Sequence, residues 1–282
     1  MKRLVIEEEK IIHNLEVIGE KSGGAPLIAV LKANAYGLGM LPMADLLRRQ
    51  GVKRFGVTEP EDAVALRDGG FLDEEILMLR STAVKEDIEK ILSSTATAAI
   101  GSYDAAVAVN GMAEEAGMVA DVHVEIDTGM GRIGFAVRSG FAETIRELEA
   151  LYALPGLDIC GVFQHFAVAD SVEPDDERYT DEQHALFAQV VERLRADGYP
   201  VGTVHCANSA AQMRYPEWHH SLTRAGIILY GLDPSPEVHF DGLRPTMTLK
   251  SVVEFVKDLL PGESVSYGRT YTDRKSTRLN SS

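Results

Sequence analysis

Residues able to do chemistry follow the ends of several apolar runs in this chain. Lys32 comes directly after the apolar run Leu27–Leu31, and a glycine-spaced turn comes next. A lysine in that position either extends its ammonium to water or loses its charge and attacks a carbonyl group. Other chemically useful residues follow later runs: Arg80, Asp127, Arg132, His165, Asn208, Ser209 and Tyr230. This distribution is typical of a site built at one end of parallel strands.

The elements that must position these residues alternate between strand and helix patterns. The expected strands are Leu27–Leu31, Arg54–Val57, Ile76–Leu79, Thr97–Ile100, Val122–Ile126, Ile159–Phe163, Thr203–Cys206 and Gly226–Tyr230. The expected helices include Met43–Gln50, Pro60–Asp68, Val84–Leu92, Tyr103–Ala116, Phe141–Tyr152 and Asp181–Asp197. About eight strands, each but the last followed by a helix, predict an α/β fold of the (β/α)8 TIM-barrel type. The alternative is an open doubly wound sheet, but the dinucleotide-type glycine fingerprint that would favour it is absent.

The pattern changes after Asp233-Pro234. Residues Met247–Val256 alternate between apolar and polar and predict one long antiparallel strand, and a turn then leads into Ser264–Gly268. We therefore expect a barrel over residues 9–232 and an incomplete C-terminal β-rich domain formed by residues 1–8 and 233–272. Residues 273–282 are polar, basic and without period, which predicts a disordered or foreign tail.

Composition narrows the classes of function. The 28 Lys and Arg against 43 Asp and Glu give a net charge of −15, which argues against nucleic acid and anionic membranes as partners. No signal peptide is evident and no apolar run approaches the ~20 residues of a membrane span, so a cytoplasmic protein is expected. The two cysteines, Cys160 and Cys206, lack metal-site spacing and are expected to be small buried side chains.

The segment Lys32-Ala33-Asn34-Ala35-Tyr36-Gly37-Leu38-Gly39 resembles the cofactor-lysine motif of alanine racemases, which carry pyridoxal 5'-phosphate on a barrel. Further segments resemble motifs of that family in the same order: Asp127–Gly134, Gln164–Asp170, His205–Ala211, Arg224–Pro234 and Val265–Tyr271. The resemblance implies an isomerase that interconverts L-alanine and D-alanine and supplies D-alanine for peptidoglycan. It also implies a homodimer with shared active sites.

The resemblance assigns roles to individual residues. The implied cofactor-binding residues are Lys32, Tyr36, His165, Asn208, Ser209, Arg224, Gly226, Ile227 and Tyr230, and the implied substrate-binding residue is Arg132. Lys32, Tyr267, His165 and Arg224 are the implied catalytic residues. Racemisation needs a base on each face of the substrate, and Lys32 with Tyr267 of a partner chain would supply them. Arg224 would face the cofactor's ring nitrogen, where a guanidinium can only donate, and this favours racemisation over transamination.

Two features depart from the family pattern. Glu125 stands where several members have a carbamylated lysine, so we expect its native carboxylate to support Arg132. Family members also continue past the end of this chain, so we expect weak or no activity.

Three alternatives stay open: a broad-specificity amino-acid racemase of the same fold, a non-catalytic barrel that carries pyridoxal phosphate, and a metal site. The third would use His123, His165 and His205, but acidic partners at ligand spacing are not evident, so no metal is expected.

Overall fold

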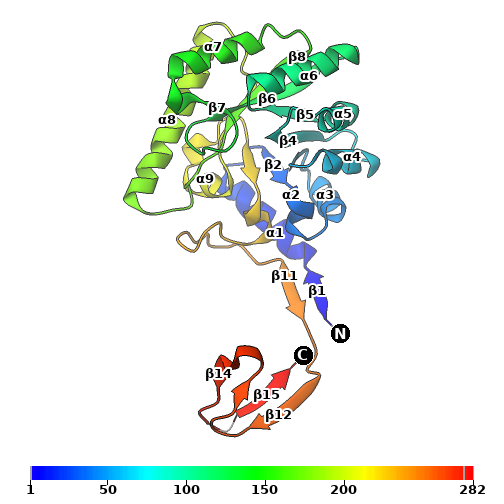
Figure 1. Cartoon of the computed structure of the whole chain (residues 1–282), viewed down its shortest axis with the longest axis vertical. Coiled ribbons are helices and arrows are strands. Elements are labelled where there is room, and N and C mark those ends of the chain that lie inside the picture. Colours follow the sequence, from blue (N-terminus) through cyan, green and yellow to red (C-terminus); the bar gives the residue numbers. More distant parts are fainter. Residues whose placement is uncertain (1, 276, 282) are drawn as a thin grey trace. The chain divides into compact units, whose positions relative to one another are not determined.

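The chain forms two units, Glu8–Pro245 and Met1–Glu7 with Thr246–Ser282. The computed structural model describes residues 2–275 and 277–281, with side chains through residue 275 (Figure 1). Among the helices of the described residues, none combines the length and the apolar character needed to cross a membrane.

Parallel strands form the wall of the larger unit. They are β2 (Leu27–Val30), β3 (Arg54–Val57), β4 (Glu75–Ser81), β5 (Thr97–Ile100), β6 (Ala120–Asp127), β8 (Leu157–Gln164), β9 (Thr203–His205) and β10 (Thr223–Ala225), and the short β7 (Phe135–Ala136) pairs with β6. The strands pair in the order β10-β2-β3-β4-β5-β6-β8-β9, so the last strand lies beside the first. The backbone N–H of Ser221 donates to the carbonyl of Val204 at 2.9 Å, which joins the segments of β9 and β10. The barrel is therefore nearly closed, and the predicted TIM-type fold is confirmed.

Helices lie on the outside of the strands (Figure 1). The α-helices are α1 (Glu8–Lys21), α2 (Lys32–Tyr36), α3 (Met40–Arg49), α4 (Pro60–Asp68), α5 (Lys85–Ser93), α6 (Tyr103–Glu115), α7 (Phe141–Leu151), α8 (Pro174–Ala196) and α9 (Ser209–Arg214). The 3-10 helices are η1 (Val137–Ser139), η2 (Pro216–Trp218), η3 (Ile227–Tyr230) and η4 (Tyr267–Arg269). In α3, Met43, Leu46 and Leu47 recur at helical spacing and are buried, so hydrophobic burial fixes which face of the helix meets the strands.

The eighth strand does not lie where the sequence predicted it. The structure places the strand at Thr223–Ala225, and most of the predicted strand Gly226–Tyr230 forms η3 instead. Gly226 adopts φ −113° and ψ −105°, which ends the extended backbone, and Leu229 N–H then donates to the Gly226 carbonyl at 3.0 Å. An apolar run alone does not separate a strand from a buried helical turn.

The smaller unit contains short antiparallel pairs. They are β1 (Arg3–Ile6) with β11 (Met247–Lys250), β12 (Phe255–Leu259) with β15 (Thr277–Ser281), and β13 (Ser264–Val265) with β14 (Tyr271–Thr272). The single long strand predicted over Met247–Val256 is therefore wrong, because residues 251–254 have no strand structure.

Two predicted boundaries also differ from the structure. Residues 233–245, predicted to belong to the β-rich domain, lie with the barrel, where Asn14 hydrogen-bonds the N–H and carbonyl of Arg244. The predicted disordered tail 273–282 includes residues 276 and 282, which lie outside the described residues. Within it, the backbone of Thr277–Ser281 forms β15, because β12 offers it a partner for its backbone hydrogen bonds.

Candidate functional site

The larger unit contains a cavity of about 550 Å3 among the loops that follow the barrel strands. Residues predicted for the site line it: Lys32, Tyr36, Arg132, His165, Asn208, Ser209, Arg224, Gly226 and Ile227. Tyr230 packs against Tyr36 with ring centroids 4.9 Å apart. Tyr267 belongs to the other unit, where its side chain is 98% exposed. The barrel therefore gathers every predicted site residue that it contains.

Lys32 lies at the start of a turn whose backbone is left-handed. Ala33, Asn34, Ala35 and Tyr36 all have φ between 52° and 55°, the left-handed region that side chains other than glycine rarely adopt. The turn brings the Lys32 Nζ to 5.7 Å from the centroid of the Tyr36 ring. Burial, and secondarily the charge of Arg132, lower the pKa of Lys32. Strain of this kind persists only where surrounding contacts impose it, and here it places an amine and a phenol in one cavity.

The left-handed turn leads to a stability prediction. Ala33 is exposed and lies at φ 54°, so Ala33→Gly removes strain without removing buried surface. We expect the variant to be more stable than the parent by about 0.5–1 kcal/mol in urea unfolding. Ala65→Gly, inside the right-handed helix α4, is the matched control and should lower stability by about 1 kcal/mol. A loss of stability in Ala33→Gly comparable with that of the control would contradict the assignment of strain.

A polar corner lies beside this turn. The N–H of Gly226 donates to the Ser209 Oγ at 2.9 Å, and a Cβ on Gly226 would come within 2.6 Å of the Tyr36 Oη. Only glycine lets these groups approach so closely. Burial raises the pKa of Tyr36 to about 12, so the phenol keeps its proton as a donor at neutral pH. The hydroxyls of Tyr36 and Ser209, the second of which accepts from the Gly226 amide, can together donate to the oxygens of a phosphate group.

Asn208 and Tyr230 support this corner from its edges. The Asn208 Oδ1 accepts a hydrogen bond from the N–H of Ala211 at 3.0 Å, so its side chain caps α9. The Tyr230 hydroxyl donates to the carbonyl of Val30 at 3.2 Å. Both residues therefore fix the local backbone, and Asn208 also lines the cavity.

Arg224 is the best-anchored cation of the site. It is 3% exposed, and its Nη2 donates to the carbonyls of Gln164 and Cys206 at 2.8 and 3.1 Å. Its Nη1 contacts the Nδ1 of His205 at 2.8 Å, and its Nη2 contacts the Nδ1 of His165 at 3.2 Å. Burial lowers its pKa to about 10, so it stays charged at neutral pH. Its Nε–H has no hydrogen-bond partner within the described residues and is available to a ligand.

The arginine sets the tautomers of two histidines. Because a guanidinium only donates, the Nδ1 atoms of His165 and His205 must accept, and their protons lie on Nε2. The Nε2 of His205 lies 2.9 Å from the Nδ1 of His123, which continues the chain of hydrogen bonds. Burial, with the charge of Arg224 second, holds the pKa of His165 and of His205 well below the usual range. These hydrogen bonds occupy both ring nitrogens of His205, one of the three ligands of the alternative metal site.

Glu125 does not support Arg132 in the way the sequence predicted. The carboxyl group lines the cavity and is 4% exposed, but its Oε2 has no hydrogen-bond partner in the described part of the chain. Burial raises its pKa to about 7, and the charges of Arg224 and Arg132 oppose that shift without cancelling it. Below that pH the neutral acid is favoured, because burial without hydrogen bonds penalises the carboxylate.

A pH-dependent stability follows for Glu125. The folded chain keeps this proton up to about pH 7, whereas the unfolded chain releases it near 4.5, so stability falls as the pH rises between these values. Glu125→Gln removes this dependence. We therefore expect the free energy of unfolding of the variant, relative to that of the parent, to increase by roughly 2–3 kcal/mol from pH 5 to pH 8 in urea unfolding. Glu147→Gln, at an exposed position of α7, is the control and should follow the parent. Parallel pH curves for Glu125→Gln and the parent would contradict the assignment.

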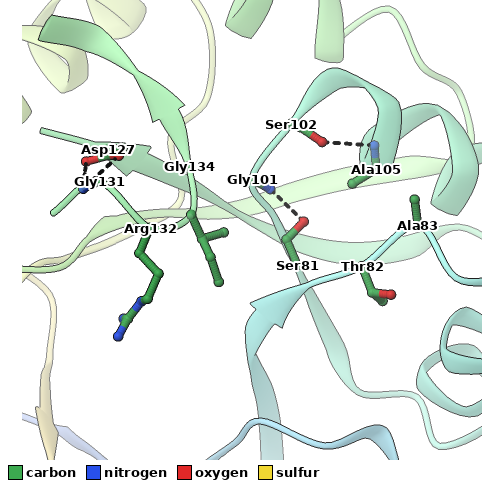
Figure 2. Close-up of a pocket in the computed structure, with 11 residues that line it drawn as sticks. Ser81, Thr82, Ala83, Gly101, Ser102, Ala105, Asp127, Gly131, Arg132 and Gly134 are labelled. Carbon is green, nitrogen blue, oxygen red and sulfur yellow. Dashed lines mark hydrogen bonds between the residues drawn. The ribbon is translucent and has the colours of Figure 1, made fainter. Parts of the chain in front are cut away.

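Arg132 borders both the main cavity and a smaller one of about 340 Å3. The Asp127 carboxylate fixes the loop before it by accepting from the N–H groups of Gly129 and Gly131 at 2.8 and 3.0 Å. Figure 2 shows the Arg132 side chain extending away from that loop. It forms no hydrogen bond or ion pair with any described residue. A carboxylate ligand could therefore engage its whole guanidinium group.

Comparisons with known proteins identify the family of the chain. The family model "Alanine racemase, N-terminal domain" matches residues 6–234. An alanine racemase of Desulforamulus reducens is 39% identical over 277 residues, which cover 97% of this chain and 73% of that protein. The chain belongs to the alanine racemase family. The enzymes of that family are isomerases that depend on pyridoxal phosphate.

Solved structures of alanine racemases extend the likeness. The alanine racemase of Clostridium difficile 630 matches with a TM-score of 0.87 and 34% identity, covering 99% of this chain and 72% of that one. A histidine racemase of Leuconostoc mesenteroides matches with a TM-score of 0.81 and 29% identity, covering 99% and 73%. The alanine racemase fold thus also occurs in an enzyme named for another amino acid.

Sequence reasoning missed three residues around Arg224. His205 was considered only as a metal ligand, although it accepts from Arg224. Phe163 lies against both, with its ring 5.6 Å from the Arg224 Cζ and stacked on His205 at 5.0 Å. The carbonyl of Gln164 is the third, and only the positions of Phe163 and Gln164 at the end of a predicted strand could have pointed to them.

Proposed function

We propose that this chain carries pyridoxal 5'-phosphate on Lys32 and interconverts L-alanine and D-alanine, which supplies D-alanine for peptidoglycan. It would act as a homodimer in which Lys32 of one copy and Tyr267 of the other share a site. The observation that carries the proposal is a buried, charged Arg224 in the same cavity as Lys32 and the hydroxyls of Tyr36 and Ser209. The Arg224 Nε–H has no hydrogen-bond partner among the described residues.

The residues present fit the cofactor. When bound, pyridoxal phosphate supplies an aldehyde that links to amines and a ring that withdraws electrons from the substrate's α-carbon. The polar corner of Tyr36, Ser209 and Gly226 offers donors for the phosphate, and Lys32 offers the amine. Arg224 would donate to the ring nitrogen without giving up its proton, and it would thereby restrain electron withdrawal. Return of a proton to the α-carbon is then favoured over group transfer.

The chain's own groups would move the protons. Burial and Arg132 lower the pKa of Lys32, which makes the neutral amine more accessible as a base on one face. On the other face, Tyr267 would act from the partner copy. His165 supports that role: because its Nδ1 accepts from Arg224, its Nε2–H is free to donate to the phenol oxygen of Tyr267. Arg132, which forms no hydrogen bond or ion pair in the part of the chain that the structure describes, would bind the substrate carboxylate.

The proposal is tested by incubating the chain, with pyridoxal phosphate added, with single L-amino acids in D2O. Chiral chromatography measures the D-product, and NMR measures loss of the α-proton signal. We expect D-alanine to form with deuterium at the α-carbon. Because a histidine racemase shares the fold, histidine belongs in the substrate panel; conversion of several amino acids at similar rates would favour the broad-specificity alternative. Cofactor binding without any α-proton exchange would overturn the proposal in favour of a non-catalytic barrel.

A further inference from the structure

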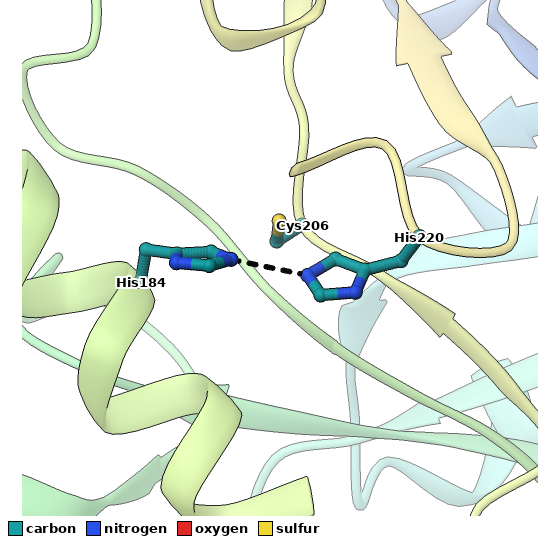
Figure 3. Close-up of side chains that lie close together, drawn as sticks. All are labelled: His184, Cys206 and His220. Atoms are coloured by element: carbon teal, nitrogen blue, oxygen red, sulfur yellow. Dashed lines mark hydrogen bonds between the residues drawn. The ribbon is translucent and has the colours of Figure 1, made fainter. Parts of the chain in front are cut away.

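A second group of ligating side chains lies outside the cavity described above. His184 comes from α8, Cys206 directly follows β9, and His220 lies between η2 and β10. One ligand atom from each lies within 4.8 Å of the others. Figure 3 shows the two imidazole rings facing each other with the Cys206 sulfur beside them. Residues 22 and 14 positions apart have no motif spacing, so the sequence analysis did not single out these three residues.

The distances suit a tetrahedral ion. The Nε2 atoms of His184 and His220 lie 3.2 Å apart and share a hydrogen bond, in which one ring donates to the other. Two nitrogens each 2.0–2.1 Å from Zn2+ at a tetrahedral angle would lie about 3.3–3.4 Å apart, and a nitrogen and a thiolate sulfur about 3.6 Å. The imidazole pair therefore already has the spacing that one ion would impose. The Cys206 Sγ lies within 4.8 Å of a ring nitrogen of each histidine and would have to move closer to reach the same ion.

The donor set selects the class of ion. One thiol and two imidazoles suit Zn2+ and exclude Mg2+ and Ca2+, which require oxygen ligands. Burial lowers the pKa of His184 to about 4 and also lowers that of His220, which favours the neutral form of both rings at neutral pH. The Cys206 Sγ now contacts the carbonyl of Trp218 at 3.2 Å as a thiol. On binding, one Zn–S and two Zn–N bonds would form, and the thiol proton would leave to solvent. The ring whose Nε2–H donates to the other would then carry its proton on Nδ1 instead.

Two further observations indicate a site that is held in place. His220 has φ 49°, a left-handed conformation that is uncommon for residues other than glycine. The His184 ring stacks on the indole of Trp218, with centroids 4.4 Å apart and an angle of 11° between the planes. Both imidazoles are thus oriented by backbone or stacking before any ion arrives, which lowers the entropy that binding must overcome.

We propose that His184, Cys206 and His220 bind one Zn2+ ion, with a fourth position open to water. The ion would join α8 to the segments after β9 and before β10. This site is separate from the proposed racemase site, although the carbonyl of Cys206 accepts from Arg224 at 3.1 Å. The bound ion would stabilise the folded chain, because a ligand that binds only the folded state adds to the stability of that state.

The test uses the untagged full chain with matched cofactor content. Zn2+ is titrated in competition with a chromogenic chelator, and Co2+ is used as a spectroscopic probe. We expect one ion per chain, a thiolate-to-cobalt absorbance band, and quenching by Co2+ of the chain's single tryptophan, Trp218. His220→Asn keeps a residue that tolerates the left-handed conformation and should weaken Zn2+ binding by at least about tenfold. Cys206→Ser should remove the charge-transfer band.

Cys160→Ser and His239→Asn are the controls, since both residues lie elsewhere in the unit, and they should bind Zn2+ as the parent does. The proposal is overturned if the parent binds no ion at micromolar Zn2+, or if His220→Asn binds as tightly as the parent. Because His220 is exposed, that variant should fold even if Cys206→Ser does not. Failure of racemisation with intact Zn2+ binding would count against the proposed function alone.

Discussion

Lys32→Ala is expected to remove the visible absorbance of the covalently held cofactor and to lower alanine turnover by about 10³-fold or more. The reason is that Lys32 would both hold the cofactor and act as the base on one face of the substrate. The measurement is an absorbance spectrum of the purified chain together with chiral analysis of product. The spectrum needs no turnover, so it reports on Lys32 even where the rate is low.

Lys53→Ala is the matched control. Lys53 is exposed and lies just before β3, away from the cavity-lining residues, so its removal should leave both readouts unchanged. If Lys32→Ala keeps the absorbance band and the turnover of the parent, another amine holds the cofactor and the role of Lys32 is wrong.

Tyr267→Phe is expected to lower racemisation by about 10²–10⁴-fold while keeping the cofactor spectrum. It removes one hydroxyl from an exposed side chain, so loss of folding would not explain the effect. Lys32 remains, so α-proton exchange in D2O should continue for one enantiomer of alanine and nearly stop for the other. Tyr271→Phe, in the same segment, is the control and should racemise normally. Equal loss of exchange for both enantiomers would contradict a role on one face.

Mixing the two inactive variants tests whether sites are shared. If Lys32 and Tyr267 come from different copies, a Lys32→Ala copy paired with a Tyr267→Phe copy has one intact site of the two. Random pairing should then restore up to about a quarter of the parent activity, because half of the dimers are mixed. No recovery after subunit exchange would place both residues of a site in the same copy.

Hydrophobic patterning was sufficient to predict the barrel. The strand β3 and the helix α4 lie where the sequence places them, because a short apolar run and a proline-initiated helix each satisfy one strong local rule. The helix α8 begins at Pro174, seven residues before the predicted start at Asp181. A proline at the first helical position and the acidic residues Asp175, Asp176 and Glu177 in the first turn were signals for that start.

Elements that depend on tertiary context were not predictable in the same way. The run Gly226–Tyr230 is apolar enough for a strand, but the backbone turns at Gly226. At this position a Cβ would come within 2.6 Å of the Tyr36 Oη, a tertiary contact that the sequence does not show. The left-handed turn over residues 33–36 contains no glycine, so its sequence does not predict positive φ angles. Contacts with the surrounding structure impose this conformation. The raised pKa of Glu125 likewise arises from burial among residues distant in the chain.

The site itself was predictable in its members but not in its contacts. The resemblance supplied Lys32, Arg132, His165 and Arg224, and the structure gathers them in one cavity. It did not indicate that Arg224 fixes the His205 tautomer, or that Arg132 forms no hydrogen bond or ion pair with a described residue. These facts depend on which hydrogen-bond donors and acceptors are paired with each other, and the pairing can be assigned only from atomic positions.

The most direct test of the central claim is to reduce the cofactor-loaded chain with borohydride, which fixes pyridoxal phosphate to the amine that holds it, and to map the labelled peptide by mass spectrometry. We predict a single labelled residue, Lys32, and no label in Lys32→Ala. A label on another lysine, or none in a chain that has taken up the cofactor, would contradict the claim.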